Sequence, residues 1–165
     1  MPRISVVDAG GQNICAMLDC IAWSEIGPDI LADPVSDDGY KVLVGSRPAQ
    51  VLTFSSYADH PHALVQAGSL ESSAAGRYQI LYRDWPYYRG LLQLPDFGPL
   101  AQDRYAIRQL LERGALSLIM AGMFDMAIAR ISNIWASLAG SRWGQHTNSM
   151  DALRKAFTDA GGVIT

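Results

Sequence analysis

The sequence predicts an α+β fold that is mostly helical, with a small antiparallel sheet after the first helix. Two observations predict it. Apolar residues recur at helical spacing over most of the chain, whereas residues 40–54 are rich in β-branched and aromatic residues. The chain has 165 residues, of which 49% are hydrophobic, enough to bury a sizeable core. We therefore expect one domain over residues 1–165, with residues 1–12 as an N-terminal arm.

Helical spacing and capping residues place the helices. The first is expected from its cap at Asn13 to about Glu25, and Gly27-Pro28 is expected to end it. Residues 28–39 and 68–75 are rich in small, polar and turn-forming residues, which predicts loops. Further helices are predicted at 61–66, from 76 to about 88 with Pro86 either kinking or dividing the helix, and at 100–113, 115–121, 123–138 and 150–160, with a loop at 140–148.

The predicted sheet is a small meander. Residues 40–44 (Tyr-Lys-Val-Leu-Val) and residues 51–54 (Val-Leu-Thr-Phe) read as strands, because β-branched and aromatic side chains fit a pleated surface. The intervening Gly-Ser-Arg-Pro at 45–48 reads as a turn, and a third strand is possible from Ser55.

Composition excludes several classes of protein. The net charge of -3 gives no broad basic surface for nucleic acid or an anionic membrane. No stretch approaches the roughly 20 apolar residues of a membrane-spanning helix, and the N-terminus lacks the apolar run of a signal peptide. Cys15 and Cys20 are too far apart on one helix for a disulfide, so we expect reduced thiols near the core. The chain is therefore expected to be made in a cytoplasm.

Glu25 is the first candidate catalytic residue. It follows Ile14, Leu18 and Ile21 on the apolar stripe of the first helix, near the negative end of the helix dipole. Burial and the dipole both raise the pKa of a carboxyl group, which keeps it protonated as a general acid. The alternative is a surface glutamate at a frayed helix end.

A second candidate is the stretch Ser73–Leu81. Its small residues let backbone approach a ligand, while Tyr78 and Gln79 offer a ring and an amide suited to sugar hydroxyls. A plain junction between a loop and a helix is the alternative. Two of the three histidines, His60 and His62, flank Pro61, which is only a weak signal for a metal site, and no nucleophile elbow or phosphate-binding glycine loop is present. We therefore expect no metal and no cofactor.

Taken together, six ordered segments resemble phage endolysins of the bacteriophage lambda type, over almost all of residues 17–162. The segments are Leu18–Glu25 (with Ala-Trp-Ser-Glu), Asp38–Gly45, Phe54–Pro61 (ending Tyr-Ala-Asp-His-Pro), Ala75–Leu81 (Ala-Gly-Arg-Tyr-Gln-Ile-Leu), Glu112–Leu116 and Ser132–Leu138 (Ser-Asn-Ile-Trp-Ala-Ser-Leu).

The resemblance implies a lysozyme-like lytic transglycosylase. Such an enzyme cleaves the β-1,4 bond between N-acetylmuramic acid and N-acetylglucosamine in peptidoglycan without water, and leaves a 1,6-anhydromuramic acid end. By its match to the Ala-Trp-Ser-Glu motif, Glu25 is the acid and base. The residues expected to line the glycan cleft are Tyr40, Tyr57, Gly76, Arg77, Tyr78 and Gln79. The implied protein is a monomer that waits in the host cytoplasm until a holin opens the inner membrane, and then acts in the periplasm.

Three departures from the family pattern and two alternatives accompany this reading. Ile26 stands where the family usually has glycine, Lys41 where it often has an acid, and Trp143 where it has tyrosine. One alternative is a hydrolytic muramidase, which needs a second carboxylate. The candidates for that carboxylate are Asp33, Asp37, Asp38 and Asp59. The other alternative is a non-catalytic murein-binding module that kept the fold.

Overall fold

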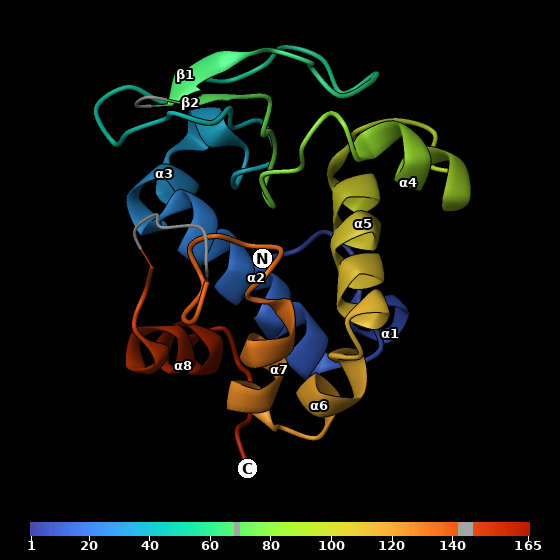
Figure 1. Cartoon of the computed structure of the whole chain (residues 1–165), viewed down its shortest axis with the longest axis vertical. Coiled ribbons are helices and arrows are strands. Elements are labelled where there is room, and N and C mark those ends of the chain that lie inside the picture. Colours follow the sequence, from blue (N-terminus) through green and yellow to red (C-terminus); the bar gives the residue numbers. More distant parts are fainter. Residues whose placement is uncertain (68–69, 142–146) are drawn as a thin grey trace. The chain divides into compact units, whose positions relative to one another are not determined.

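The structure is a computed structural model that describes residues 1–67, 70–141 and 147–165 (Figure 1). The predicted loop at 140–148 therefore lies partly outside the described residues, as do Trp143 and His146. The chain divides into two compact units. Unit 1 comprises residues 1–25 and 106–165, and unit 2 comprises residues 26–105. That the two form one catalytic domain stays a prediction.

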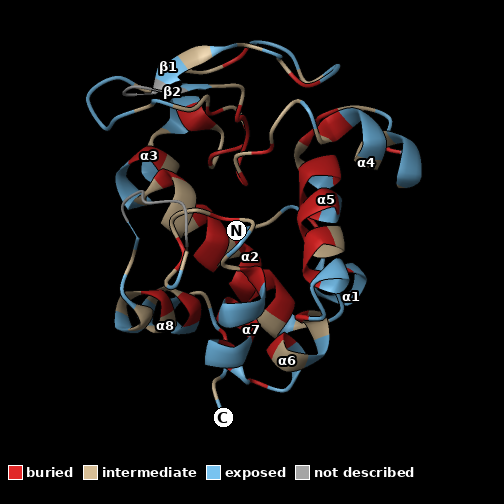
Figure 2. Cartoon of the chain, viewed as in Figure 1, coloured by how far each residue is buried: buried red, intermediate tan, exposed pale blue. Residues whose placement is uncertain are grey.

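Unit 1 is helical and is built around the helix that carries Glu25. This helix, α2, runs over Gln12–Ile26, and its residues from Ile14 to Ala22 are at most 6% exposed apart from Asp19 (Figure 2). It is thus apolar around most of its circumference, because Cys15, Ala16 and Cys20 extend the predicted stripe. Other helices of the unit are α1 (Val6–Ala9), the second half of α5 (Pro99–Glu112), α6 (Leu116–Met120), α7 (Phe124–Ile131) and α8 (Met150–Asp159).

The N-terminal arm differs from the prediction. Ser5 caps the short helix α1 by accepting a hydrogen bond from the backbone N–H of Asp8 at 3.1 Å. Asn13 lies inside α2 rather than at its cap. Its side-chain amide donates to the carbonyls of Ile119 and Val163, at 3.0 and 3.1 Å, and so ties α2 to the C-terminal tail. The local sequence does not show whether such an asparagine caps the helix or bonds to residues more than 100 positions away.

Predictions for the later helices are confirmed with altered ends. The predicted helix at 100–113 is α5, and that at 150–160 is α8, with Ser149 as its cap. The helix predicted over 123–138 ends at Ile131 and continues as turns. Trp135 and Leu138 are nevertheless buried, so the apolar stripe indicated burial correctly but not the helix beyond Ile131.

Unit 2 opens with two short helices where a loop was predicted. Helix α3 spans Pro28–Ala32, and the 3-10 helix η1 spans Pro34–Ser36. Pro28 ends the preceding helix as predicted, but it also occupies the first turn of α3, where a missing N–H costs nothing. Ile30 packs with Ile26 and Val42 in a small apolar cluster of this unit, which explains why a polar segment folds.

The sheet is antiparallel, as predicted, but it lies later in the chain. Strands β1 (Val65–Ala67) and β2 (Leu70–Ser72) pair in the register Val65↔Ser72, Gln66↔Glu71 and Ala67↔Leu70. The predicted helix at 61–66 and the predicted loop at 68–75 are therefore wrong at these strands. The predicted strands at 40–44 and 51–54 meet only through single bridges, such as Val42↔Thr53. The α+β class itself is confirmed.

The predicted helix beginning at Gly76 is also wrong. Ala75 and Ile80 form an antiparallel bridge, with N–H···O distances of 3.0 and 2.8 Å, and residues 76–79 make the turn between them. Gly76 has φ 77° and Gln79 has φ 48°, both outside the helical region. Helix α4 begins only at Trp85 and ends at Leu91, with Pro86 in its first turn rather than at a kink.

Candidate active site

Glu25 lies in the last turn of α2 and is the last residue of the first segment of unit 1. Its side chain is partly exposed, so a ligand can reach it, yet protein surrounds most of the carboxyl. Burial raises the pKa of Glu25 above its ordinary value of 4.5, although hydrogen bonds from Ser137 act in the opposite direction. The carbonyl end of the helix is a further source of negative potential. Burial and the helix end therefore both favour the protonated, uncharged form of this carboxyl.

Ser137 holds this carboxyl from the segment that follows α7. Its hydroxyl donates to Oε1 of Glu25 at 2.5 Å, and its backbone N–H points to the same oxygen at 3.3 Å. Sequence reasoning did not single out this residue. The segment Ser132–Leu138 carried part of the family resemblance, but nothing local in it points to a residue 112 positions earlier.

Two more residues extend the contact with Glu25. The hydroxyls of Ser24 and Ser137 are 2.7 Å apart, and the side-chain amide of Asn148 donates to the Ser24 hydroxyl at 3.0 Å. The backbone N–H of Asn148 donates to the carbonyl of Ser137 at 2.8 Å. Unit 1 thus brings together three polar residues, from three separate parts of the chain, around one predicted catalytic group.

In unit 2, three of the predicted glycan-binding residues form a buried cluster. Tyr40, Arg77 and Tyr78 are each at most 1% exposed. The hydroxyls of both tyrosines donate to Oδ1 of Asp103, at 2.7 Å from Tyr40 and 2.6 Å from Tyr78. Arg77 pairs with Asp38 at 2.7 Å and lies over the ring of Tyr40. Because these three side chains are buried, they are placed to support the protein surface above them rather than to form it.

The other three predicted residues lie nearer to solvent or shape the backbone. Tyr57 is half-buried, donates its hydroxyl to Asp37 at 2.6 Å and lies beneath the ammonium group of Lys41. Gln79 is also half-buried, and its amide donates to the carbonyl of Gly76 at 3.0 Å. Gly76 is buried, and a Cβ atom there would lie 2.2 Å from Oε1 of Gln102, so no larger residue fits unchanged.

The four aspartates considered as a second catalytic carboxylate all have structural partners in unit 2. Asp33 caps η1 through the N–H of Val35 at 3.0 Å. Asp37 accepts from Tyr57, and Asp38 pairs with Arg77. Asp59 accepts from the indole N–H of Trp85 at 2.6 Å and pairs with Arg89 at 2.7 Å.

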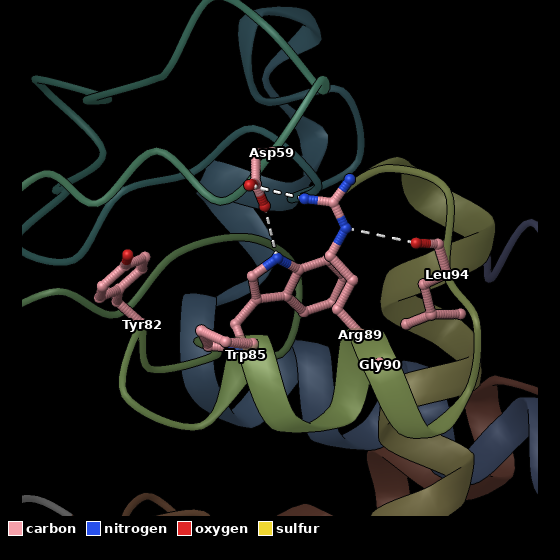
Figure 3. A pocket seen from close by; sticks show the side chains of 7 residues that line it. Asp59, Tyr82, Trp85, Arg89, Gly90 and Leu94 are labelled. Carbon is pink, nitrogen blue, oxygen red and sulfur yellow. Dashed lines mark hydrogen bonds and ion pairs between the residues drawn. The ribbon is translucent and has the colours of Figure 1, made fainter.

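A surface pocket of about 410 Å³ lies beside the last of these groups (Figure 3). It is lined by Asp59, Tyr82, Trp85, Pro86, Arg89, Gly90 and Leu94. Burial raises the pKa of Asp59, but the hydrogen bonds from Trp85 and from the His60 N–H, with the charge of Arg89, outweigh it and lower this pKa overall. The opposite charges of Asp59 and Arg89 thus neutralise each other in this pocket. Asp59, one of the candidates for a second carboxylate, lines the pocket, whereas Glu25 and the six predicted glycan-binding residues do not.

The histidine pair at 60 and 62 has a structural explanation. One ring nitrogen of His60, Nε2, lies 2.8 Å from the carbonyl of Ile80, while Nδ1 accepts from the N–H of His62 at 3.1 Å. Both ring nitrogens of neutral His60 therefore have a hydrogen-bond partner within the protein. Within the described residues, no group of three histidine, cysteine or carboxylate side chains could hold a metal ion. Cys15 and Cys20 are both buried free thiols, as predicted. Burial, and to a smaller extent the negative charge of Asp19, raises the pKa of Cys20 to about 12.

Comparison with known proteins gives consistent results. A family model described as Endolysin matches residues 15–164. The endolysin of Escherichia phage P2 is 44% identical over 159 residues, covering 92% of this chain and 94% of that protein. The endolysin of Escherichia phage lambda is 45% identical over 150 residues, covering 90% and 91%.

Two solved structures are similar over 100% of both chains. One is bacteriophage lambda lysozyme complexed with a chitohexasaccharide, at 43% identity and a TM-score of 0.85. The other is lysozyme from bacteriophage lambda, at 41% identity and a TM-score of 0.81. Fold and comparisons together define a lysozyme-like enzyme. The chain belongs to the endolysin family, the phage enzymes that degrade peptidoglycan for lysis.

Among the described residues, no helix has both the length and the apolar character needed to cross a membrane.

Proposed function

We propose that the chain is a peptidoglycan lytic transglycosylase, which cleaves the β-1,4 bond between N-acetylmuramic acid and N-acetylglucosamine without water. The observation that carries this proposal is the environment of Glu25. A partly exposed carboxyl with a raised pKa, held by Ser137, suits an acid that must give up its proton to a bound substrate.

One carboxyl group is sufficient for the proposed reaction. The O–H bond of Glu25 breaks and its proton passes to the glycosidic oxygen, while the bond from that oxygen to C1 of the muramic acid breaks. The resulting carboxylate then takes the proton of the C6 hydroxyl as the C6 oxygen bonds to C1. The ring closes as a 1,6-anhydro sugar, no water is consumed, and Glu25 is protonated again.

The partners of the aspartates in unit 2 support this single-carboxyl mechanism over hydrolysis. A hydrolytic muramidase needs a second carboxylate as nucleophile or base. Of the candidates, Asp38 is paired with a buried arginine and Asp59 accepts bonds from Trp85 and Arg89. A carboxylate engaged in such bonds is a weaker nucleophile and base than a solvated one, because its negative charge is already stabilised.

The six predicted glycan-binding residues are proposed to act in two ways. Tyr57 and Gln79, which are half-buried, would contact the sugars directly through a ring and an amide. Tyr40, Arg77 and Tyr78 would hold the turn at 75–80 in place from below. Gly76 would let that turn adopt its positive φ. The chitohexasaccharide bound by the similar lambda lysozyme supports a glycan ligand for this chain.

We further propose the biological setting that the family resemblance implies. The chain would be made in the host cytoplasm, would depend on a holin for its release and would act on the periplasmic cell wall as a monomer. The support is its membership of the endolysin family. A non-catalytic murein-binding module remains the second candidate function, and the following experiment separates the two.

Replacing the acid without changing its shape tests the proposal. Glu25→Gln should release no soluble muropeptides from purified peptidoglycan, with a loss of about 1000-fold or more in rate, because a positioned acid and base is lost. Binding to the same peptidoglycan, measured by co-sedimentation, should be retained. The matched control is Glu71→Gln, which alters an exposed glutamate of β2. Lysis at the wild-type rate by Glu25→Gln would refute the proposal.

A further inference from the structure

A chain of hydrogen bonds in unit 1 ends on one particular oxygen of Glu25. It links the side chains of Asn148, Ser24 and Ser137 in that order, with distances of 3.0 Å and 2.7 Å, and reaches Oε1 of Glu25 at 2.5 Å. The established family membership does not require these three residues to have any role. Their arrangement nevertheless has a direction, and that direction can be deduced from the chemistry of each group.

The orientation of the Asn148 amide sets the direction. Its Nδ2 faces the Ser24 hydroxyl and two backbone carbonyls, those of Ser137 at 3.4 Å and Ser24 at 3.5 Å. An amide oxygen in that position would face two other carbonyl oxygens, which only accept hydrogen bonds. The NH₂ group therefore points at Ser24. The N–H of Asn148 on Ser137 anchors the backbone from which this side chain extends.

The hydroxyl hydrogens follow from that orientation. The Ser24 oxygen accepts from Asn148, so its own hydrogen is directed to Ser137. The Ser137 oxygen accepts that hydrogen and directs its own to Oε1 of Glu25. The N–H of Ser137 points to the same oxygen. Both hydrogen bonds that Glu25 receives from described residues thus fall on Oε1.

We infer that Asn148, Ser24 and Ser137 are positioning residues that keep Oε1 of Glu25 as an acceptor and leave Oε2 to carry the catalytic proton. This inference rests on the proposed function, and it deepens it by naming the reacting atom. In both steps of the proposed reaction Oε2 would be the oxygen involved, first giving its proton to the glycosidic oxygen and then taking one from the C6 hydroxyl. The carboxyl would not need to rotate between the steps.

In the part of unit 1 that the structure describes, the ionisable neighbours of Glu25 are few, so the effect of Ser137 should be separable. Residues 132–141 contain no ionisable side chain. On α2 the others are Cys15, Asp19 and Cys20, of which Asp19 pairs with the N-terminal amine at 3.5 Å. On α8, Asp151, Arg154, Lys155 and Asp159 form exposed ion pairs with one another or with Asp125. Among the described residues of this unit, the hydrogen bonds from Ser137 are therefore the main stabilising contacts for ionised Glu25.

The first test measures the titration midpoint of the Glu25 carboxyl by NMR, and it does not depend on enzyme activity. The chain contains three glutamates, Glu25, Glu71 and Glu112, so labelling glutamate with ¹³C at Cδ gives three signals, and Glu25→Gln assigns one of them. Ser137→Ala should raise the titration midpoint of Glu25, because it removes a donor that stabilises the carboxylate. Ser137→Thr should restore the wild-type midpoint. Ser132→Ala, which alters a hydroxyl bonded only weakly at the end of α7, is the matched control.

Ser24→Ala gives a second variant in case Ser137→Ala does not fold. It removes the preceding link of the chain and should shift the midpoint in the same direction by a smaller amount. An unchanged midpoint in both alanine variants, or an equal shift in Ser132→Ala, would overturn the inference. So would neutron diffraction at low pH that finds deuterium on Oε1 of Glu25 rather than on Oε2.

The second test links the midpoint to catalysis. Ser137→Ala should move the high-pH limb of muropeptide release upward with the midpoint, because the acid stays protonated to higher pH. Its plateau rate should fall about 10-fold, since the carboxyl is less well oriented. If Glu25→Gln is inactive while the midpoint does not respond to Ser137, the inference fails and the function stands. If Glu25→Gln is active while the midpoint does respond, the proposed function fails instead.

Discussion

Tyr78 donates its hydroxyl to the buried carboxylate of Asp103 at 2.6 Å, across 25 positions of sequence. Tyr40 donates to the same oxygen at 2.7 Å. The Asp103 side chain is fully buried, so the two hydroxyls replace water around its carboxylate. This contact holds the turn at 75–80 against the start of α5 within unit 2.

Tyr78→Phe should therefore destabilise the protein. The variant keeps the ring but removes one donor from a buried acceptor, which costs about 1–3 kcal/mol. Urea unfolding measured by circular dichroism would report the loss as a lower midpoint at unchanged slope. Tyr87→Phe is the control, because the ring of Tyr87 is 64% exposed. An unchanged midpoint for Tyr78→Phe would mean that the hydroxyl contributes nothing to the fold.

Gly76→Ala should be more damaging than most glycine substitutions. The residue has φ 77°, and its new Cβ would clash with the Gln102 side chain, which itself accepts from the N–H of Arg77 at 2.9 Å. Positive φ and overpacking together predict a loss of about 2–4 kcal/mol. Gly90→Ala has open space and should be neutral or slightly stabilising. Thermal unfolding of the two variants compares them, and equal melting temperatures would contradict the account.

Glu25→Gln should stabilise the protein while it abolishes activity. Burial raises the pKa of Glu25 in the folded state above the value of 4.5, so the folded protein holds this proton more tightly. Stability is then lost as pH rises from the unfolded pKa through the folded one, by about 1.4 kcal/mol for each pH unit between them. The glutamine variant avoids this loss. Urea unfolding of both proteins at several pH values should show a gap that is absent below pH 4.5 and grows above it.

A gap that stayed constant with pH would show that Glu25 does not titrate differently in the folded and unfolded states. Glu71→Gln serves again as the control, because it makes the same chemical change at an exposed glutamate.

Asp59→Asn should retain most of the activity. Its carboxylate accepts a hydrogen bond from the indole N–H of Trp85 and pairs with Arg89. An asparagine side-chain oxygen can still accept the hydrogen bond from the indole. We expect muropeptide release to fall by less than about 10-fold, whereas loss of a second catalytic carboxylate would cost far more. The rate of release from purified peptidoglycan decides this. A fall as large as that of Glu25→Gln would favour a hydrolytic muramidase with Asp59 as its second carboxylate.

Local pattern was sufficient to locate the helices with regularly spaced apolar residues. The stripe Ile14, Leu18 and Ile21 located α2 and placed Glu25 at its end, and the Gly114 stop located the end of α5 to within two residues. These features depend on residues a few positions apart, which sequence displays directly. The family resemblance identified the fold class because it drew on several such segments at once.

The errors arose where distant residues decide the local conformation. Tyr78, Trp85 and Tyr88 recur at near-helical spacing, but Asp103 binds Tyr78 and a turn with positive φ at Gln79 interrupts any helix. The groups that hold Glu25 were missed for the same reason, since Ser137 and Asn148 carry no local signal of their contact with it. Long-range hydrogen bonds of this kind have no signature in hydrophobic periodicity.

The measurement that tests the central claim most directly is mass spectrometry of the muropeptides released from purified peptidoglycan by the wild-type chain. The account predicts products that end in 1,6-anhydromuramic acid, one water lighter than hydrolysed products and unchanged by borohydride. Products with a reducible muramic acid end would contradict the single-carboxyl mechanism of Glu25 and would require a second carboxylate. Release of no products at all, with binding retained, would favour the non-catalytic module.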